Sequence, residues 1–462
     1  MAARPRRRHL WLLGVALLAL ASALAGLGAR ATYSARTSAD EPQYLLTAQS
    51  LADDFSIDIS DELARRAYLP YHEVTLDPQT YPLDSSGRQV SPHDPLLPAL
   101  LAVPMAVAGW VGAKVALAAV AACCAALTAG LAHSRFGISK RVAVTVVAAG
   151  FTTIPLAAYG TQVYPEMAAG LAVLIGIAGL TGGTACDSDL RRTLVLTLAA
   201  VIALPWLAVK YVPVAAVLGV ALLVRLRNHR TQLVSAAAIA ALAAIAYLAA
   251  HQWLYGGWTV YAAGDHFVGD GEFSVVGTQA DPVGRTRRLV GLLVDRQFGI
   301  AAWSPLWLVL PFAVVHWLRR HRGYPTTVVA AVVGVAWLNA TFVALTMHGW
   351  WVPGRQLVVA LPAALILVAG WVEADVRRRL PLAAALGLLG AVNWLWLAFE
   401  ASTERRTLIV DFADTASWPY RLVQGLLPDG IAGGASNDLL LLTWTLLLAA
   451  AVAFSEHRRA AC

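Results

Sequence analysis

Long apolar runs separated by short polar segments dominate this chain. Stretches such as Leu10 to Leu27, Val195 to Val209 and Leu380 to Phe399 have the length of helix that crosses a hydrocarbon layer of about 30 Å. About twelve such spans are expected, near residues 10–29, 113–132, 142–158, 165–182, 194–209, 212–224, 232–254, 299–318, 325–346, 356–372, 380–398 and 438–454. The pattern predicts an all-α, polytopic membrane protein.

Composition supports this prediction. Of the 462 residues, 58% are hydrophobic and 14% are charged, whereas a soluble protein carries about 25% charged residues. This is too little charge to coat several soluble domains, so a soluble enzyme and a disordered chain are excluded. The four cysteines have no spacing typical of zinc, haem or a redox pair, and neither a metal site nor a disulfide scaffold is indicated.

The basic residues are concentrated in alternate loops. With the N-terminus inside, the inner segments collect Arg4, Arg6, Arg7, Arg8, Arg135, Lys140, Arg141, Arg191, Arg192, Arg225, Arg227, Arg230, Arg319, Arg320, Arg322, Arg377, Arg378, Arg379, Arg458 and Arg459, with few acids among them. Short loops rich in arginine mark the cytoplasmic side, so both termini are predicted to be cytoplasmic. The first span has features of a signal peptide, but an uncleaved anchor is expected.

This topology places three long segments outside, at residues 30–112, 255–298 and 399–437. The first has room for an amphipathic surface helix, an irregular stretch and a short apolar helix from Leu96 to Trp110. A second surface-lying piece is expected from Trp418 to Leu427. With no internal repeat or linker evident, residues 1–462 are interpreted as a single membrane domain capped by these external loops.

An acidic pair stands just past the first span, at Asp40 and Glu41. Ser38 and Glu41 are spaced as a capping box, and both acids suit the positive end of a helix dipole. Alternatively, a carboxylate held where membrane meets water could act as a general base on a hydroxyl acceptor. Glu166, where the fourth span begins, has the same two interpretations: it is a helix cap, or an acid that faces a shared external pocket.

The order of these motifs resembles the GT-C superfamily of integral membrane glycosyltransferases, which use sugars linked to polyprenyl phosphate. The resemblance is carried by Asp40-Glu41-Pro42, Tyr44-Leu45, Ser91, His93-Asp94-Pro95, Val163-Tyr164-Pro165-Glu166, Asp295, Phe298-Gly299, Ser304-Pro305, Trp350-Trp351 and Gly354-Arg355. It covers most of the chain and is densest over residues 35–170. Leu96 and Leu357 depart from the closest bacterial branch.

The resemblance implies an inverting transfer at the anomeric carbon, with polyprenyl phosphate as the leaving group. Asp40 would be the general base, with Glu41 beside it, and Glu166 would orient the acceptor or donor sugar. Candidate ligands of the lipid phosphate are Lys210, Arg355, Arg296 and His93. Each has a simpler alternative: Lys210 can anchor at the interface, Arg355 follows an aromatic belt, and His93 can hold a Pro-rich turn.

The expected protein is therefore a multi-pass glycosyltransferase of a bacterial plasma (inner) membrane, with its site facing outward. Its partners would be membrane lipid, the polyprenyl-phosphate sugar donor, and an envelope glycan, glycolipid or protein acceptor. We expect a monomer with no cofactor, no metal and no nucleic-acid partner. A transporter or flippase of lipid-linked sugars is the alternative from another class, although its usual half repeats and midplane charges are not evident.

Overall fold

The computed structural model describes residues 9–82, 87–183, 186–260, 281–320, 323–344, 347 and 349–460, with only the backbone of 81–82 and 455–460. Arg4, Arg6, Arg7, Arg8 and Arg322 of the predicted inner face lie outside these ranges. So does the middle of the expected external segment 255–298. For Arg458 and Arg459, the side chains are not described.

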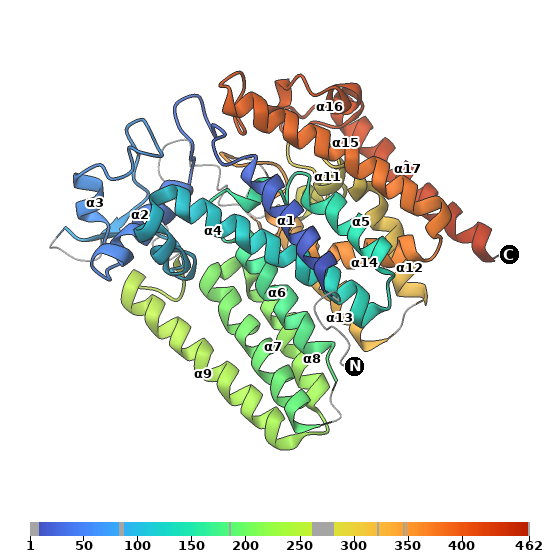
Figure 1. The fold of residues 1–462 in the computed structure, drawn as a ribbon, viewed down its shortest axis with the longest axis horizontal. Coiled ribbons are helices and arrows are strands. Elements are labelled where there is room, and N and C mark those ends of the chain that lie inside the picture. The colour runs from blue at the N-terminus through green and yellow to red at the C-terminus, as the bar shows by residue number, and fades with distance from the viewer. Residues whose placement is uncertain are drawn as a thin grey trace, which may run out of the picture.

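The described chain is mostly helical (Figure 1). Its α-helices are α1 (Leu10–Leu24), α2 (Glu41–Asp53), α3 (Ser60–Ala64), α4 (Leu96–Phe136), α5 (Lys140–Phe151), α6 (Glu166–Leu180), α7 (Asp187–Leu207), α8 (Val212–Leu226), α9 (Arg230–Tyr255), α10 (Pro282–Arg285), α11 (Arg288–Val294), α12 (Leu310–Arg320), α13 (Tyr324–Phe342), α14 (Leu361–Glu373), α15 (Val376–Ser402), α16 (Trp418–Val423) and α17 (Ala435–Ala460).

Short 3-10 turns and one small hairpin complete the described elements. The turns are η2 (Ala158–Gly160), η3 (Val209–Tyr211), η5 (Pro305–Val309), η6 (Arg355–Leu357), η7 (Phe412–Asp414) and η8 (Gln424–Leu426). The strands β1 (Tyr81–Pro82) and β2 (Gln89–Val90) pair antiparallel. Two of the turns, η3 and η6, are important below because each carries a basic residue.

Seven helices among the described residues are long and apolar enough to cross a membrane: α4, α7, α8 with the preceding turn, α9, α13, α15 and α17. The helices α1, α6 and α14 are also apolar but shorter. The molecule is therefore an all-α membrane protein, as predicted. The number of spans near twelve and the orientation of the termini remain predictions.

The first external segment ends in the short apolar helix that the sequence predicts. This helix is the first part of α4, and the backbone leaves helical geometry at Ala108 (φ −143, ψ 23) and Gly109 (φ 58, ψ −152). The positive φ at Gly109 suits a glycine. The rest of α4, which runs to Phe136, follows this break as a second helical piece.

Helix α14 lies at the centre of the fold. Its residues from Leu361 to Gly370 are all buried, and it contacts α4, α5, α6, α12, α13 and α15. By contrast, α9 and α17 lie at opposite margins of the molecule (Figure 1), with 11% and 0% of their most apolar windows buried. Helices that are apolar all round but packed on one side only are suited to lipid contact.

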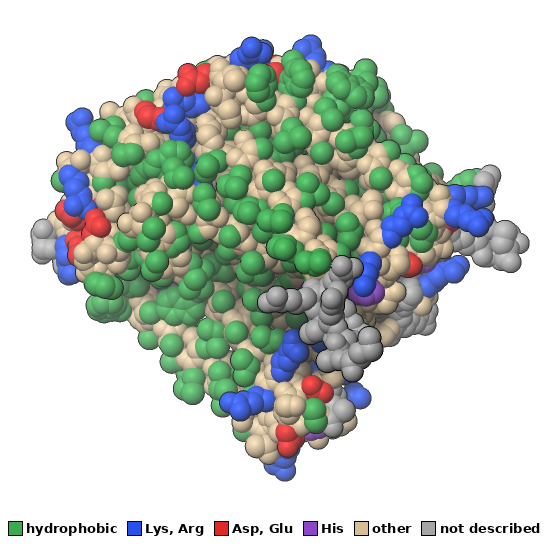
Figure 2. Space-filling model, viewed as in Figure 1, with side chains coloured by type: hydrophobic (Ala, Val, Ile, Leu, Met, Phe, Trp, Pro, Cys, Tyr) green, Lys and Arg blue, Asp and Glu red, His purple; other side chains and the backbone are tan. Residues whose placement is uncertain are grey.

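Hydrophobic side chains cover the broad middle of the face shown in Figure 2, and charged side chains gather towards its margins. Exposed large apolar residues follow α9, at Val234, Ile239, Leu242, Ile245 and Leu248. A soluble protein rarely exposes so large a continuous apolar surface. This surface is the one that the hydrocarbon of a bilayer would cover.

Close helix packing yields a prediction about two glycines. A Cβ at Gly387 on α15 would lie 2.3 Å from the Ala149 Cβ and 3.0 Å from its Cα on α5, whereas a Cβ at Gly219 on α8 would meet nothing described within 4 Å. Gly387→Ala should destabilise the protein by about 1–3 kcal/mol because the helices must separate. The control Gly219→Ala should be neutral or stabilising by up to about 1 kcal/mol. Thermal midpoints in one detergent measure both, and equal effects would contradict this packing.

Candidate functional site

Asp40 stands at the start of α2 but does not cap it. It occupies the N-cap position, yet its side chain makes no hydrogen bond to the helix, and its Oδ2 instead accepts from the Arg355 Nη2 at 2.8 Å. The preceding residue, Ala39, has φ +46, a conformation that costs a non-glycine residue energy and is concentrated at functional sites. The Asp40 side chain therefore does not cap α2. Its carboxylate faces Arg355 instead.

Arg355 bridges the two acids that the sequence singled out. Besides its bond to Asp40, its Nε donates to the Glu166 Oε1 at 2.9 Å. The same oxygen accepts from the Lys210 Nζ at 2.7 Å. Asp40, Arg355, Glu166 and Lys210 thus form one continuous row of alternating charges, which we call the charged row. It joins residues that lie up to 315 positions apart in the chain.

Aromatic rings fix the guanidinium in this position. The Arg355 Cζ lies 3.9 Å from the centre of the Tyr164 ring and 4.9 Å from that of the Trp351 ring. Such contacts attract a cation through the ring quadrupole, by about 2 kcal/mol or more when the pair is desolvated. Arg355 itself follows Gly354, whose φ of +84 suits glycine. A Cβ at Gly354 would also lie 2.8 Å from the Ile300 Cγ2.

The members of the charged row differ in exposure. The side chains of Glu166 and Arg355 are 1% and 8% exposed, whereas those of Asp40 and Lys210 are 19% and 21% exposed. Burial alone would raise the pKa of Asp40, but the Arg355 guanidinium and the His93 ring outweigh it and hold that pKa well below its usual range. Asp40 is therefore ionised, and Asp40 and Lys210 are the two members of the charged row that are partly exposed.

His93 joins the charged row at its edge. Its Nε2 lies 3.7 Å from the Asp40 Oδ1, beyond hydrogen-bond length, and its Nδ1 lies 2.5 Å from the Ser91 Oγ. The ring packs against Tyr44 with centres 4.7 Å apart, and the Tyr255 hydroxyl donates to the His93 backbone oxygen. The imidazole is thus held directly beside the Asp40 carboxylate.

Asp94, the next residue, braces the turn that carries Lys210. Its Oδ2 accepts from the Val209 backbone N–H at 3.0 Å, and its Oδ1 is shared by the Tyr247 hydroxyl at 3.0 Å and the His251 Nε2 at 2.9 Å. Asp94 and His251 are buried. The carboxylate therefore ties the first loop to α9 and fixes the η3 turn, and with it the position of the ammonium.

Glu41 lies deeper than Asp40 and has different partners. Its Oε2 accepts from the Val163 N–H at 2.8 Å and its Oε1 from the Ser38 N–H at 3.3 Å. The second bond is half of the expected capping box, while the Ser38 hydroxyl donates to the Trp350 carbonyl. Burial raises the pKa of Glu41, and Lys114 is the strongest opposing charge. Glu41 fastens the Asp40 turn to the segment before α6.

Arg296 is not part of the charged row. Its Nε and Nη2 donate to the Asp429 Oδ2 at 2.9 and 2.6 Å, and Gln297 donates to the same oxygen at 3.1 Å. Asp295 next to it accepts from the Gly430 N–H at 2.6 Å. The structure thus brings together Asp40, Glu166, Lys210, Arg355 and His93, places Glu41 behind them, and leaves Arg296 in a clasp that holds the 428–432 loop.

Several polar atoms around the charged row are buried without a hydrogen-bond partner in the part of the chain that the structure describes. They are the Glu166 Oε2, the Tyr211 hydroxyl and the side-chain amides of Gln43 and Gln162. Buried polar groups are nearly always satisfied by protein, water or ligand. Among the described residues, no group of three or more His, Cys, Asp or Glu side chains is arranged to hold a metal ion.

Sequence reasoning missed three contributors to this site: Asp94 with His251, Lys114 near Glu41, and the two rings that stack on Arg355. A signal existed for two of them. His251 and Lys114 lie inside apolar runs, where an ionisable residue is costly and usually has a partner. The contact of Tyr164 with Arg355 depends on the fold alone, because the two residues are distant in the sequence.

Two solved structures resemble this chain along most of its length. ArnT from Cupriavidus metallidurans bound to undecaprenyl phosphate gives a TM-score of 0.46 at 14% identity, over 96% of this chain and 77% of that chain. The Archaeoglobus fulgidus oligosaccharyltransferase in the apo form gives 0.47 at 12% identity, over 88% and 57%. Neither a family model nor a curated protein sequence matches this chain.

The Asp94 brace generates a stability prediction. Asp94→Asn removes a charge from three donors, two of them buried, and we expect a loss of about 1–3 kcal/mol in the free energy of unfolding. The matched control is Asp53→Asn, whose partner Arg65 and own side chain are both 49% exposed, and which should change stability by less than about 1 kcal/mol. Chemical unfolding in one detergent compares the two. Similar losses would show that Asp94 braces nothing.

The buried carboxylate of Asp295, next to Arg296 in the clasp, predicts that the stability of the protein depends on pH. Burial raises the pKa of Asp295 to about 6, against the opposing pull of three backbone N–H groups, whereas an unfolded aspartate has a pKa of about 3.9. The folded state therefore binds the Asp295 proton more tightly than the unfolded state does. This tighter binding stabilises the folded state fully below pH ~4, and the stabilisation is lost as the pH rises to ~6. We expect the thermal midpoint to fall over this window.

The size and the variants make this pH prediction testable. The shift corresponds to about 3 kcal/mol at most. Asp295→Asn should have a lower midpoint throughout but a flatter dependence over the same pH window, while Asp53→Asn should keep the wild-type slope. An unchanged slope in Asp295→Asn would assign the pH dependence to another group.

Proposed function

We propose that this protein is an inverting membrane glycosyltransferase of the GT-C type. It would move a sugar from a polyprenyl-phosphate donor to a hydroxyl of an envelope glycan, a glycolipid or a protein at the outer face of a bacterial plasma membrane. One observation carries the proposal: an ionised carboxylate, Asp40, lies at the rim of a row that also holds the cations of Arg355 and Lys210. The donor class comes from the motif resemblance.

In this reaction Asp40 is the general base. It takes the proton from the acceptor hydroxyl while that oxygen forms a bond to the anomeric carbon from the face opposite the phosphate. The bond between the anomeric carbon and the phosphate oxygen breaks, and its electron pair leaves with the polyprenyl phosphate. The sugar configuration is therefore inverted, and the proton ends on Asp40.

The cations stabilise the charge that develops on the leaving phosphate. A guanidinium has five N–H donors and an ammonium has three, and the bonds of Arg355 and Lys210 to the two acids use only some of them. The remaining donors can meet phosphate oxygens, and His93 can add another at the edge. Fixed donors of this kind need no reorganisation as charge develops.

Glu166 and Glu41 have positioning roles in this scheme. Glu166 holds both cations through one oxygen, and its buried Oε2 has no partner among the described residues, so it can accept from a sugar hydroxyl. Both Glu41 oxygens are taken by backbone N–H groups, which suits it to hold the Asp40 turn. Arg296, bound to Asp429, is not needed for phosphate binding.

The proposal predicts the effect of removing the base. Asp40→Asn keeps the size of the side chain and a hydrogen-bond acceptor for Arg355 but cannot take a proton, so transfer should fall by about 10²–10⁴-fold. Donor binding and protein level should stay near wild type. The matched control is Asp54→Asn, an exposed acid at the end of the same helix, which should keep full transfer.

The assay would use purified protein in lipid nanodiscs with polyprenyl-phosphate arabinose, mannose, galactose or glucosamine. It would follow release of polyprenyl phosphate and, separately, binding of the labelled donor. Loss of release with retained binding in Asp40→Asn supports catalysis. Undiminished release in Asp40→Asn would refute the role of Asp40. In proteoliposomes, movement of donor across the bilayer without release would indicate the alternative, a transporter or flippase.

A further inference from the structure

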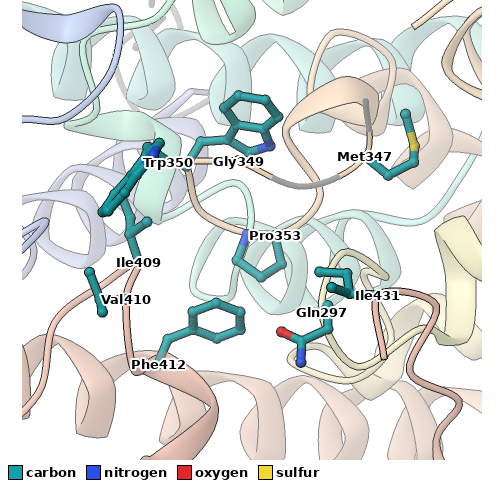
Figure 3. Close-up of a pocket in the computed structure, with 10 residues that line it drawn as sticks. Gln297, Met347, Gly349, Trp350, Pro353, Ile409, Val410, Phe412 and Ile431 are labelled. Carbon is teal, nitrogen blue, oxygen red and sulfur yellow. The ribbon is translucent and has the colours of Figure 1, made fainter. Parts of the chain in front are cut away.

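A cavity lies next to the segment that carries Arg355, and the reaction described above does not use it. It is a cavity of about 290 Å³ (Figure 3), at the lower end of the ~300–1,000 Å³ typical of small-molecule sites. Its size suits one or two sugar rings better than a long chain. It is lined by Gln297, Met347, Gly349, Trp350, Trp351, Pro353, Ile409, Val410, Phe412 and Ile431.

One segment, residues 349–355, connects the cavity to the charged row. Its first residues form a wall of the cavity, and its last residue is the central cation of the row. The Trp350 carbonyl accepts from the Ser38 hydroxyl at 2.8 Å, two residues before Asp40, and the Trp351 ring faces the Arg355 guanidinium. Two wall residues of the cavity therefore contact the turn before Asp40 and the Arg355 guanidinium.

The same segment is held rigidly. The Tyr159 hydroxyl donates to the Val352 carbonyl at 2.8 Å, and the Gly354 N–H donates to the Phe298 carbonyl at 3.1 Å. Val352 is fully buried. The wall thus has the fixed geometry that a binding site requires, and its opposite side comes from the segment that leads into η7.

The lining chemistry favours a neutral, hydroxylated ring. None of the described lining side chains is charged, so an anionic or cationic ligand would be desolvated without compensation. Trp350, Trp351 and Phe412 offer flat apolar faces, against which the C–H face of a sugar ring packs. Gln297 supplies a polar contact: its Nε2 donates to Asp429, and its amide oxygen points towards Phe412 (Figure 3), where it can accept from a hydroxyl.

We propose that this cavity binds a neutral sugar ring of the acceptor and directs one of its hydroxyls towards Asp40. The inference rests on the proposed function for the identity of the bound molecule as acceptor. It commits to carbohydrate over a prenyl or acyl chain because the wall carries a fixed amide and lies mostly in loop segments beside the charged row.

Binding of simple glycosides tests this proposal independently of catalysis. The probes are methyl α-mannopyranoside, methyl α-glucopyranoside and methyl α-arabinofuranoside, measured by saturation-transfer NMR on the full chain in nanodiscs, with farnesol as the chain probe. At least one glycoside should bind the wild type, and Trp350→Leu should weaken it about tenfold. The control Trp418→Leu removes an exposed tryptophan of α16 that does not line the cavity and should leave binding unchanged.

Two further variants make the outcomes decisive. Gln297→Leu, which removes the amide, should also weaken glycoside binding, and Asp40→Asn should keep it. If the wild type transfers no sugar but Asp40→Asn still binds the glycoside, the proposed function is wrong and the sugar site is still supported. No glycoside binding, equal binding in Trp350→Leu and wild type, or displacement of the glycoside by farnesol would overturn the sugar site.

Discussion

A buried guanidinium held between two carboxylates is the interaction on which the site depends. Removing a cation from water costs several kcal/mol, and that cost is recovered only when opposite charges and hydrogen bonds surround it. Arg355 has both, from Asp40 and Glu166, and two aromatic faces besides. The loop before α2, the start of α6 and the segment before α14 must therefore meet at one point.

The same constraint explains why the supporting contacts surround this point. Glu41 ties the Asp40 turn to Val163, Asp94 ties the η3 turn to α9, and Gly354 allows the close approach of the backbone to Ile300. Each contact joins segments that are far apart in the sequence. A site held by several such ties can keep charged groups within a fraction of an ångström of a working geometry.

Sequence patterns predicted the helical membrane class and the identity of most charged residues at the site, because apolar runs and isolated charges can be seen without a fold. They could not predict pairing. Whether the Asp40 side chain caps α2 depended on where Arg355 lay, 315 positions away in the chain. The same limit applies to Arg296, because no sequence pattern indicates its partner Asp429.

In the proposed reaction Asp40 would be a weak base, because its pKa lies well below its usual range. Base strength matters less when the leaving group needs no proton, and a phosphate ester leaves as a stable anion. The main requirement is then to hold the acceptor oxygen in line with the anomeric carbon. Correct orientation of reacting groups can lower an activation barrier by about 7–11 kcal/mol. The guanidinium that weakens Asp40 as a base also fixes its direction. The wall of the proposed sugar cavity includes Trp351, whose ring faces the same guanidinium. This cavity would fix the direction of the acceptor as Arg355 fixes that of Asp40. Acceptor binding and the orientation of the base would therefore be coupled through Arg355.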